Sequence, residues 1–343
     1  MSMPRQGSRQ IRMEDVAARV GVSRTTVSFV LNERPDASIS KATRMRILEA
    51  ASELGYRPHA GARALAAQRS GLIGMVTEVV TTDFGPGTIR GAQDAAWHDG
   101  QFLLIAATEG RRELEEFAVE RLMQQRVEGF IFAAGFHREV TPPQALYDLP
   151  AVLVHCFDPE GRLPSIVPDE KLGGYRATRR LIEAGHRRIG LVNLEETTVA
   201  ARGRLEGYIE ALKERHIPVE AQLITHAPAM ADGGYESSGR LLDLAEPPTA
   251  LFCCTDRMAM GAYDAIRDRG LTIPRDVSVI GFDNQELIAS YLRPGLTTIA
   301  LPFSTMGLQA VHFVNDLVND RSIPARTEVE CPLVERSSVA SPR

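Results

Sequence analysis

The sequence predicts two parts of different fold class, a small all-α head and a large α/β core. Two short amphipathic stretches joined by a glycine turn occupy residues 14–32. From Leu72 onward, short β-rich apolar runs alternate with amphipathic helical stretches. The charge is divided in the same way, because residues 1–70 carry twelve Lys and Arg against six Asp and Glu. A basic helical head on an acidic α/β core follows from these three observations.

Two apolar stripes at helical spacing predict the first two helices of the head. The stripes consist of Val16, Ala17 and Val20 on the first helix and Val27, Val30 and Leu31 on the second. Gly21 ends the first helix, since glycine tolerates the left-handed backbone, and the Ser23 hydroxyl caps the second. This is the pattern of a helix-turn-helix unit, although such helix pairs also occur in proteins that never contact DNA.

A third helix follows Ser40, whose hydroxyl caps it. Its apolar positions, Ile47, Leu48, Ala51 and Leu54, close a three-helix core. The head has a net charge of +6, which leaves −11 for the remaining 273 residues of a chain whose total is −5. An excess of cations attracts phosphate, so we expect DNA binding that weakens as salt rises. A solvated basic face is the alternative.

The core is predicted to be α/β because its strands are apolar throughout and alternate with helices. The strand candidates are LIGMVTEVV, FLLIAA, GFIFAA, AVLVHC, RIGLVN, ALFCC and VSVIGFD. The helical stretches are Ile89 to His98, Glu113 to Gln124, Lys171 to Ala184, Arg202 to Arg215, Asp256 to Arg269 and Phe303 to Val318. Strands that helices cover on both faces imply parallel sheets. The 273 residues after the head are many for one sheet domain.

Three motifs lie within residues 13–71: VGVSRTTVSFVLN, ISKATRMRILEAASELGYRP and ARALAAQRSGLIG. They closely resemble the lactose-repressor (LacI/GalR) family of transcriptional regulators, and the resemblance covers essentially the whole chain. It implies an all-α helix-turn-helix head plus an α/β periplasmic-binding-protein-like core of two doubly wound subdomains with a cleft between them. The implied boundaries are 1–57 for the head, 58–70 for a hinge helix and linker, and 71–343 for the core, whose first subdomain takes about 71–167 and 301–328 and whose second takes about 168–300 and 329–343.

By this resemblance the second helix, Ser23 to Asn32, enters the major groove of DNA. Arg24, Thr25 and Phe29 occupy base-reading positions. Arg24 suits the O6 and N7 edge of a guanine, or a phosphate. Many relatives carry Arg at the position of Phe29, and a phenyl ring offers only apolar contact, for example to a thymine methyl. The rest of the DNA-binding set is Ser23, Thr26, Ser28, Asn32 and Arg63, with Thr26, Ser28 and Asn32 expected on phosphate or backbone.

The segment Pro58 to Ala67 is shorter than the roughly 12 to 15 residues that an isolated helix needs. In the family this stretch becomes helical when two subunits pair over the operator, and its leucine, Leu65 here, wedges into the minor groove. Gly61 weakens such a helix by about 1 kcal/mol relative to alanine. The alternative is a plain linker.

Effector-binding residues are expected beyond the carboxyl ends of the strands, where ligands collect in open α/β sheets. Arg204 in RLEGY matches the family's effector-holding arginine, whose planar fork suits a carboxylate or paired hydroxyls. Asp283 in GFDN matches a pocket aspartate. The resemblance adds Thr255, which ends the strand ALFCC, Phe84 in the first strand-to-helix loop, and His155, where many relatives carry aspartate.

Four further residues near these motifs have structural as well as functional readings. Asp169 fits the first position of the family's Asp-Asn pair, whereas Glu170 replaces the amide with a charge. Asp256 is expected to cap the helix DRMAMGAYDAI rather than bind ligand. Tyr208 is expected in the core. Of these, only Asp169 joins the effector-binding set.

Catalysis is not indicated, because the chain contains no GxxxxGK[ST] loop, no GxGxxG after a strand and no HExxH pair. The four cysteines show no CxxC spacing. We therefore expect no enzymatic activity, no metal, no cofactor and no disulfide. No apolar run reaches about 18 residues and MSMPRQGSRQ lacks the apolar core of a signal peptide. We expect a cytoplasmic protein at the nucleoid, without a membrane partner.

These features predict a sequence-specific repressor, controlled by a sugar or related metabolite bound between the core subdomains. Its partners would be a pseudo-palindromic double-stranded DNA operator, the effector and a second copy in a homodimer. Two alternatives share the core: a two-lobed sugar-binding protein and a sugar- or nucleotide-processing enzyme.

Overall fold

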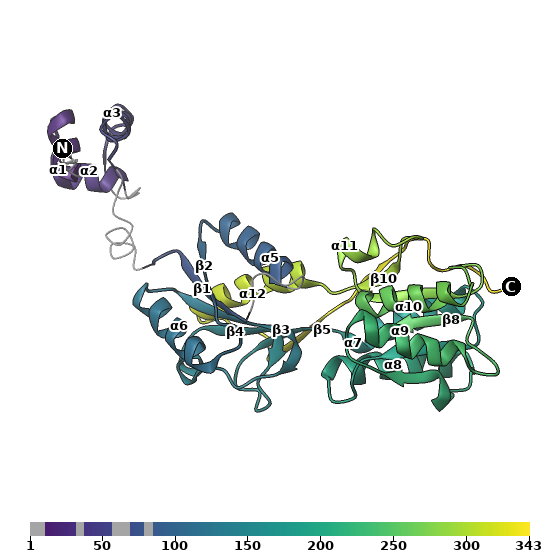
Figure 1. Cartoon of the computed structure of the whole chain (residues 1–343). Coiled ribbons are helices and arrows are strands. Elements are labelled where there is room, and N and C mark those ends of the chain that lie inside the picture. Colours follow the sequence, from purple (N-terminus) through teal and green to yellow (C-terminus); the bar gives the residue numbers. More distant parts are fainter. Residues whose placement is uncertain (1–10, 32–37, 57–68, 79–84) are drawn as a thin grey trace, which may run out of the picture. The chain divides into compact units, whose positions relative to one another are not determined.

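The computed structural model describes residues 11–31, 38–56, 69–78 and 85–343. The chain divides into two compact units, Met1–Gly71 and Leu72–Arg343 (Figure 1). The expected hinge helix, together with the candidates Asn32, Arg63, Leu65 and Phe84, lies outside the described residues.

The described residues of the head form three helices, α1 (Met13–Val20), α2 (Arg24–Leu31) and α3 (Lys41–Glu53). The predicted end signals are confirmed. Gly21 has a left-handed backbone with φ of 75°, and its N–H donates to the Ala17 carbonyl at 2.9 Å. Ser23 accepts a hydrogen bond from the backbone N–H three residues later at 3.0 Å, and Ser40 does the same at 3.1 Å. Both hydroxyls therefore satisfy helix-terminal donors.

The core of the head differs from its predicted apolar pattern at one position of α3. Val16, Val27 and Ile47 are fully buried, one from each helix. The prediction for Leu48 is wrong, because its side chain is 49% exposed. Ala50, on the buried face of α3, occupies the core in its place. Leucine at position 48 falls just outside the stripe that faces α1 and α2, since that stripe needs spacings of three and four residues from Ile47.

Residues 72–78 and 85–343 of the core unit form two six-stranded sheets, each of mainly parallel strands (Figure 1). The first has the order β11-β5-β4-β3-β1-β2 and is parallel throughout. Its strands are β1 (Leu72–Thr77), β2 (Phe102–Ala107), β3 (Gly129–Glu139), β4 (Ala151–Phe157), β5 (Ser165–Pro168) and β11 (Arg326–Val329). The second has the order β12-β10-β9-β8-β6-β7, with β12 antiparallel to β10. Its strands are β6 (Ile189–Asn193), β7 (Ile224–His226), β8 (Ala250–Cys253), β9 (Ser278–Asp283), β10 (Thr297–Ala300) and β12 (Leu333–Val334).

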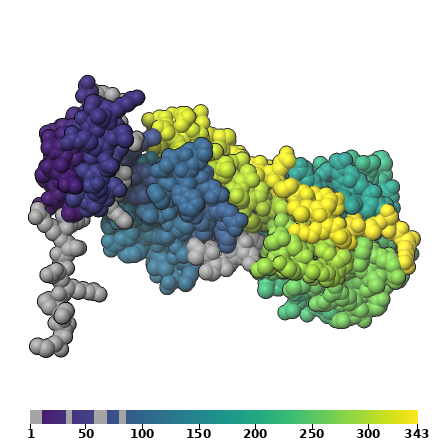
Figure 2. All heavy atoms as spheres, turned by 90° about the horizontal axis from the view of Figure 1, so that it is seen from above, coloured from purple at the N-terminus to yellow at the C-terminus, as the bar shows by residue number. Residues whose placement is uncertain are grey.

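Helices cover both sheets, as predicted for a doubly wound core. The helices are α5 (Gly85–His98), α6 (Arg112–Gln124), α7 (Glu170–Glu183), α8 (Val199–Glu214), α9 (Ala231–Leu242), α10 (Asp256–Asp268), α11 (Glu286–Ala289) and α12 (Phe303–Val318), with 3-10 turns at Gln144–Asp148 and Ala221–Leu223. Helices α5 and α12 pack together over one part of the first sheet's core, and α6 packs over another. The chain passes between the sheets after β5, after β10 and after β11. We call each sheet with the helices that cover it a lobe, the first lobe containing β1 and the second β6. Residues beyond 300 consequently belong to both lobes of the core (Figure 2).

In the part of the chain that the structure describes, three helix pairs approach so closely that glycine is required at the crossing. In the pair α7 and α8, a Cβ atom on Gly174 would lie 2.4 Å from the Arg204 carbonyl oxygen, and one on Gly207 would lie 2.1 Å from the Lys171 carbonyl oxygen. The pairs α9–α10 and α5–α12 have the same reciprocal arrangement. These crossings set the positions of side chains on the paired helices, and α7 and α8 carry Glu170 and Arg204.

Candidate functional sites

The exposed face of α2 carries the predicted base-reading residues. Arg24 and Thr25 at its start are exposed, and Phe29, one turn later, is 38% exposed. Val27 and Val30 on the opposite side are buried in the head. A helix of this kind can present its outer residues to the edges of bases in a major groove.

Local contacts already engage part of this face. The Arg24 Nε lies 3.4 Å from the Glu14 carboxylate of α1, with both side chains largely exposed. A surface ion pair of this kind is weak and readily exchanged for a phosphate or a base. The Ser23 hydroxyl caps α2 by accepting from the Thr26 N–H. Ser23 and Thr26 therefore hold the start of the helix that carries Arg24.

A buried charged cluster connects the two lobes of the core. Glu170, the first residue of α7, is 4% exposed. Its carboxylate accepts a hydrogen bond from Arg204 Nε on α8 at 2.8 Å. On its other side His137 Nδ1 of β3 lies 3.3 Å from Glu170 Oε1. Because β3 belongs to the first sheet and α7 and α8 belong to the second lobe, this carboxylate bridges the lobes.

Arg204 is enclosed by groups of the chain itself. Beyond Glu170, it donates to the Cys254 carbonyl, and its Nη1 lies 3.9 Å from the Asp283 carboxylate. Its guanidinium carbon lies 3.6 Å from the centre of the Phe282 ring. The Arg204 side chain is only 4% exposed. The planar fork expected to hold an effector is thus largely occupied by intrachain partners.

Burial and this arginine determine the ionisation of the cluster. Burial alone would raise the pKa of Glu170, but the Arg204 charge and the His137 hydrogen bond outweigh it and hold that pKa at about 2. Burial raises the pKa of Asp283 well above its ordinary value, against the opposing effect of Arg204. Burial lowers the pKa of His155 to about 3. Glu170 is therefore the ionised acid of the cluster at neutral pH, and the His155 imidazole is neutral.

Two of the candidate residues have an unusual backbone. His155 has φ of 60° and Asp283 has φ of 111°, values in the left-handed region that favours glycine. Each ends or interrupts a buried strand, β4 or β9. Strained residues of this kind gather at ligand sites. Among the described residues, the buried nitrogens His137 Nε2 and His155 Nδ1 have no hydrogen-bond partner.

The expectation that Asp256 caps α10 is wrong. Thr255 is the cap, and its hydroxyl accepts the Met258 N–H at 3.0 Å. Asp256 is fully buried and accepts from the Gln285 N–H and the Thr298 hydroxyl, each at 2.6 Å. Burial raises its pKa to about 7 despite these bonds. Asp256 thus ties down the turn that follows Asp283.

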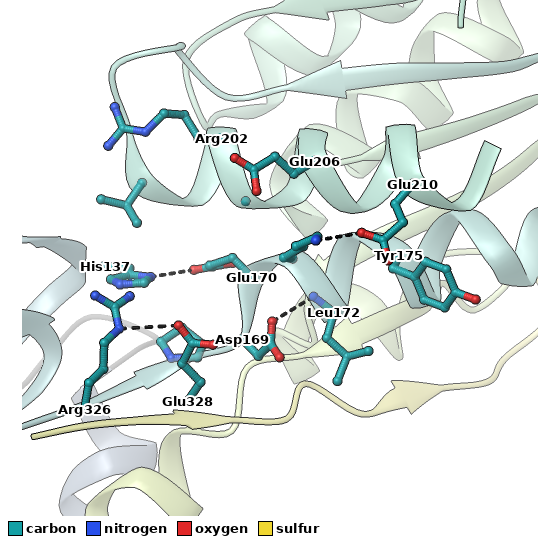
Figure 3. A pocket seen from close by; sticks show the side chains of 14 residues that line it. His137, Asp169, Glu170, Leu172, Tyr175, Arg202, Glu206, Glu210, Arg326 and Glu328 are labelled. Atoms are coloured by element: carbon teal, nitrogen blue, oxygen red, sulfur yellow. Dashed lines mark hydrogen bonds and ion pairs between the residues drawn. The ribbon is translucent and has the colours of Figure 1, made fainter. Parts of the chain in front are cut away.

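A cavity of about 550 Å³ opens where the lobes meet (Figure 3). His137 points from the first lobe toward Glu170, while Arg326 and Glu328 line one side. Its other lining residues come mainly from α7 and α8, together with Asp169 immediately before α7. The Asp169 carboxylate caps α7 by accepting the Leu172 N–H at 2.8 Å.

A second cavity of about 690 Å³ is lined by residues from both lobes, including Arg90 of α5, Asp283, Gln285 and Phe303. Of the predicted effector residues, Asp169 lines the first cavity and Asp283 the second. Arg204, His155 and Thr255 are buried and line neither of these two cavities. The described residues contain no group of three His, Cys, Asp or Glu that could hold a metal, and no helix among them is long and apolar enough to cross a membrane.

His137 is the site residue that motif reading passes over. The apolar run GFIFAA continues as GFHREV, and β3 extends to Glu139. A buried histidine at the carboxyl end of a central parallel strand is the signal that could identify it. Phe303, whose ring lies edge-on to His155 at 5.1 Å between centroids, is likewise placed only by the fold.

His155 should make the stability of the core pH-dependent. Its pKa is lowered by burial from 6.5 to about 3, so between these values the unfolded chain binds a proton that the folded chain does not. The contribution of neutral His155 to the stability of the folded core is complete above about pH 6.5 and is lost as pH falls toward 3. Replacing His155 by Asn should therefore flatten the fall of melting temperature between about pH 6.5 and 4. His98→Asn is the control, since that ring is 88% exposed; equal curves for both variants would contradict the prediction.

Comparison with family models identifies both parts of the chain. Residues 12–59 match the model described as "Bacterial regulatory proteins, lacI family", and residues 178–339 match that of a periplasmic binding protein-like domain.

Full-length relatives match along nearly the whole chain. The chain is 36% identical over 332 residues to the HTH-type transcriptional regulator GalR of Salmonella typhimurium, covering 96% of each chain. It is 32% identical over 332 residues to the HTH-type transcriptional repressor PurR of Pasteurella multocida, covering 96% of this chain and 98% of the relative. Among solved structures, a lac repressor dimer bound to operator and the anti-inducer ONPF has a TM-score of 0.79 at 27% identity, covering 97% of this chain and 100% of that one.

Proposed function

Since the chain belongs to the LacI family of bacterial regulatory proteins, we propose that it is a repressor whose affinity for a pseudo-palindromic operator depends on a small metabolite bound between the lobes. As a member of that family it is a DNA-binding transcriptional regulator and not an enzyme. The proposed effector is a sugar or a related metabolite. The proposed place of action is the cytoplasm, on chromosomal DNA.

The buried cluster between the lobes is the observation that carries the effector proposal. His137, Glu170 and Arg204 join the lobes, and two cavities of about 550 and 690 Å³ lie at the same boundary. Cavities of this size suit small metabolites. The orphaned imidazole nitrogens of His137 and His155 support a ligand that supplies polar hydrogen. We assign His155, Asp169, Thr255 and Asp283 to the walls or the support of this site.

The proposed control is a shift between two arrangements of the lobes. An effector can change operator affinity only by the difference between its affinities for the two arrangements. The carboxylate of Glu170 contacts a residue of each lobe, so a change in lobe arrangement must change its contacts. This makes the cluster a suitable element for linking ligand binding to DNA binding.

Exposed apolar side chains support a homodimer as the binding unit. On the first lobe, Trp97 and Phe102 are more than half exposed, and Phe102 lies on the edge strand β2. On the second lobe, Leu287 is 79% exposed and Tyr291 67% exposed. A second copy would cover such surfaces and would place two heads on two half-sites.

The test is DNA binding by the purified full chain. Gel-shift assays with genomic fragments at about 50 mM salt should give a retarded band that fades by about 200 mM. Adding sugars and related metabolites should identify one that changes the affinity. Failure of every fragment to shift under dilute buffer, with or without metabolites, would overturn the proposed function.

Phe29 should set a base preference that arginine alters. The Phe29→Arg variant replaces apolar contact by a bidentate donor, so selection from random operators should show a gain of guanine at one position in each half-site, worth about 1 to 3 kcal/mol. Met45→Arg is the matched control, because it adds the same charge at a residue of α3 that is 70% exposed. An unchanged preference profile in Phe29→Arg would remove Phe29 from the reading face.

A further inference from the structure

We propose that Glu170 is an internal carboxylate ligand of Arg204, and that it thereby excludes acidic effectors from the site between the lobes. The restriction on effector class rests on the proposed function. The pairing of Glu170 with Arg204 does not, because it concerns the folded core alone. Glu170 is thus a specificity-determining residue of the interlobe site.

The Nε and Nη1 donors of Arg204 already have partners within the chain. An arginine in a metabolite site ordinarily offers its planar fork to a carboxylate of the ligand. Here the Nε donor is bound to Glu170 at 2.8 Å, Nη1 is bound to the Cys254 carbonyl, and the face of the group lies on the Phe282 ring. A ligand carboxylate would have to displace Glu170 or lie beside it.

The charge and the burial of Glu170 and Arg204 disfavour a second carboxylate beside them. The side chains of Glu170 and Arg204 are each 4% exposed, so solvent screens neither of them well. Glu170 is ionised, and its charge balances that of Arg204. A second carboxylate placed here would meet an ionised carboxylate without a further buried cation in this cluster to balance it, and close like charges are strongly unfavourable.

The charges that line the cavity containing Glu170 also disfavour an acidic ligand. Its lining contains five acidic side chains against three basic ones. Lys171 is bound to Glu210 at 2.7 Å, and the Arg326 Nε lies 3.4 Å from Glu328. Arg202 at the edge is exposed to solvent. The field of the lining therefore opposes an anion, whereas hydroxyl groups can bond to the acids and to the orphaned His137 Nε2.

The first experiment tests the pairing without any effector. Glu170→Ala should leave a space beside Arg204 that a small carboxylate can enter. Sodium acetate, compared with sodium chloride at equal ionic strength, should raise the melting temperature of Glu170→Ala by several degrees more than that of the wild type. Glu170→Gln is the control, because it removes the charge and fills the space. Equal acetate effects on the three proteins would overturn the pairing; folding of Glu170→Ala only in acetate would support it.

The second experiment tests the restriction with matched pairs of probes, galactose with galacturonate and glucose with glucuronate, measured by calorimetry. The wild type should bind each acid at least about 100-fold more weakly than its neutral partner. In Glu170→Gln this ratio of affinities should be smaller by at least about 10-fold. Wild type that binds an acid as well as its neutral partner would overturn the restriction. Acetate rescue with no binding of either sugar would instead count against the sugar effector of the proposed function while the pairing stood.

Discussion

Replacing Arg204 by alanine is expected to lower the free energy of unfolding of the core by about 3 to 5 kcal/mol, because it leaves a buried carboxylate without its ion partner. Glu170 is 4% exposed and would keep only the His137 contact. The loss should be measured by urea denaturation at pH 7, followed by circular dichroism. An absent effector response in this variant is therefore informative only when its stability is known.

A double variant separates pairing from packing. Glu170→Gln with Arg204→Met removes both charges at nearly constant volume, so it should recover most of the stability that Arg204→Ala loses. Arg202→Ala is the control, because Arg202 lies two residues earlier on α8 and is exposed; its effect should stay within about 0.5 kcal/mol. If Arg204→Ala were no less stable than Arg202→Ala, the buried ion pair would not be stabilising.

The fold class is predictable because its strongest signals are local. Each of the seven apolar runs corresponds to a strand of the structure, namely β1, β2, β3, β4, β6, β8 and β9. The strands β5, β7, β10, β11 and β12 have four residues or fewer; β8 also has four, but it lies in the five-residue apolar run ALFCC. A run that short shows no period, and pairing with a neighbouring strand decides its structure.

Helix α9 shows where tertiary packing overrides propensity. Its sequence ADGGYESSGRLL contains three glycines, which disfavour a helix, and the pattern does not predict one. The structure accounts for two of them directly, since a Cβ on Gly233 would lie 2.5 Å from the Pro228 carbonyl oxygen. A Cβ on Gly234 would lie 2.1 Å from the Met258 carbonyl oxygen of α10, so the crossing requires glycine. The glycine content that suggests a loop in the sequence is therefore what allows α9 to pack closely against α10.

The candidate effector site is only partly predictable, since motifs name single residues and not their partners. Arg204 and Asp283 are proposed from RLEGY and GFDN, and the structure places their side chains 3.9 Å apart. The bridge through Glu170 depends on His137, which lies 33 residues earlier, on β3 of the other lobe. The extra charge of Glu170 is visible in the sequence, but its role depends on the distance between α7 and α8.

That distance depends on Gly207. Gly207→Ala would place a Cβ atom 2.1 Å from the Lys171 carbonyl oxygen and 2.4 Å from the Tyr175 nitrogen, both backbone atoms that cannot turn aside. Alanine favours a helix by about 1 kcal/mol over glycine, but overpacking costs about 1 to 3 kcal/mol or more. We expect a net loss of stability, larger still for Gly207→Val, measured by urea denaturation of the full chain.

Gly239→Ala is the matched control, since its Cβ would meet only the end of the Arg269 side chain, at 3.0 Å, in the middle of another helix. That end can move, so the helix-propensity gain should make this variant neutral or more stable. Separation of α7 from α8 would also part Glu170 from Arg204, because each lies one turn or less from the crossing residues. A Gly207→Ala protein as stable as Gly239→Ala would show that the crossing does not position the cluster.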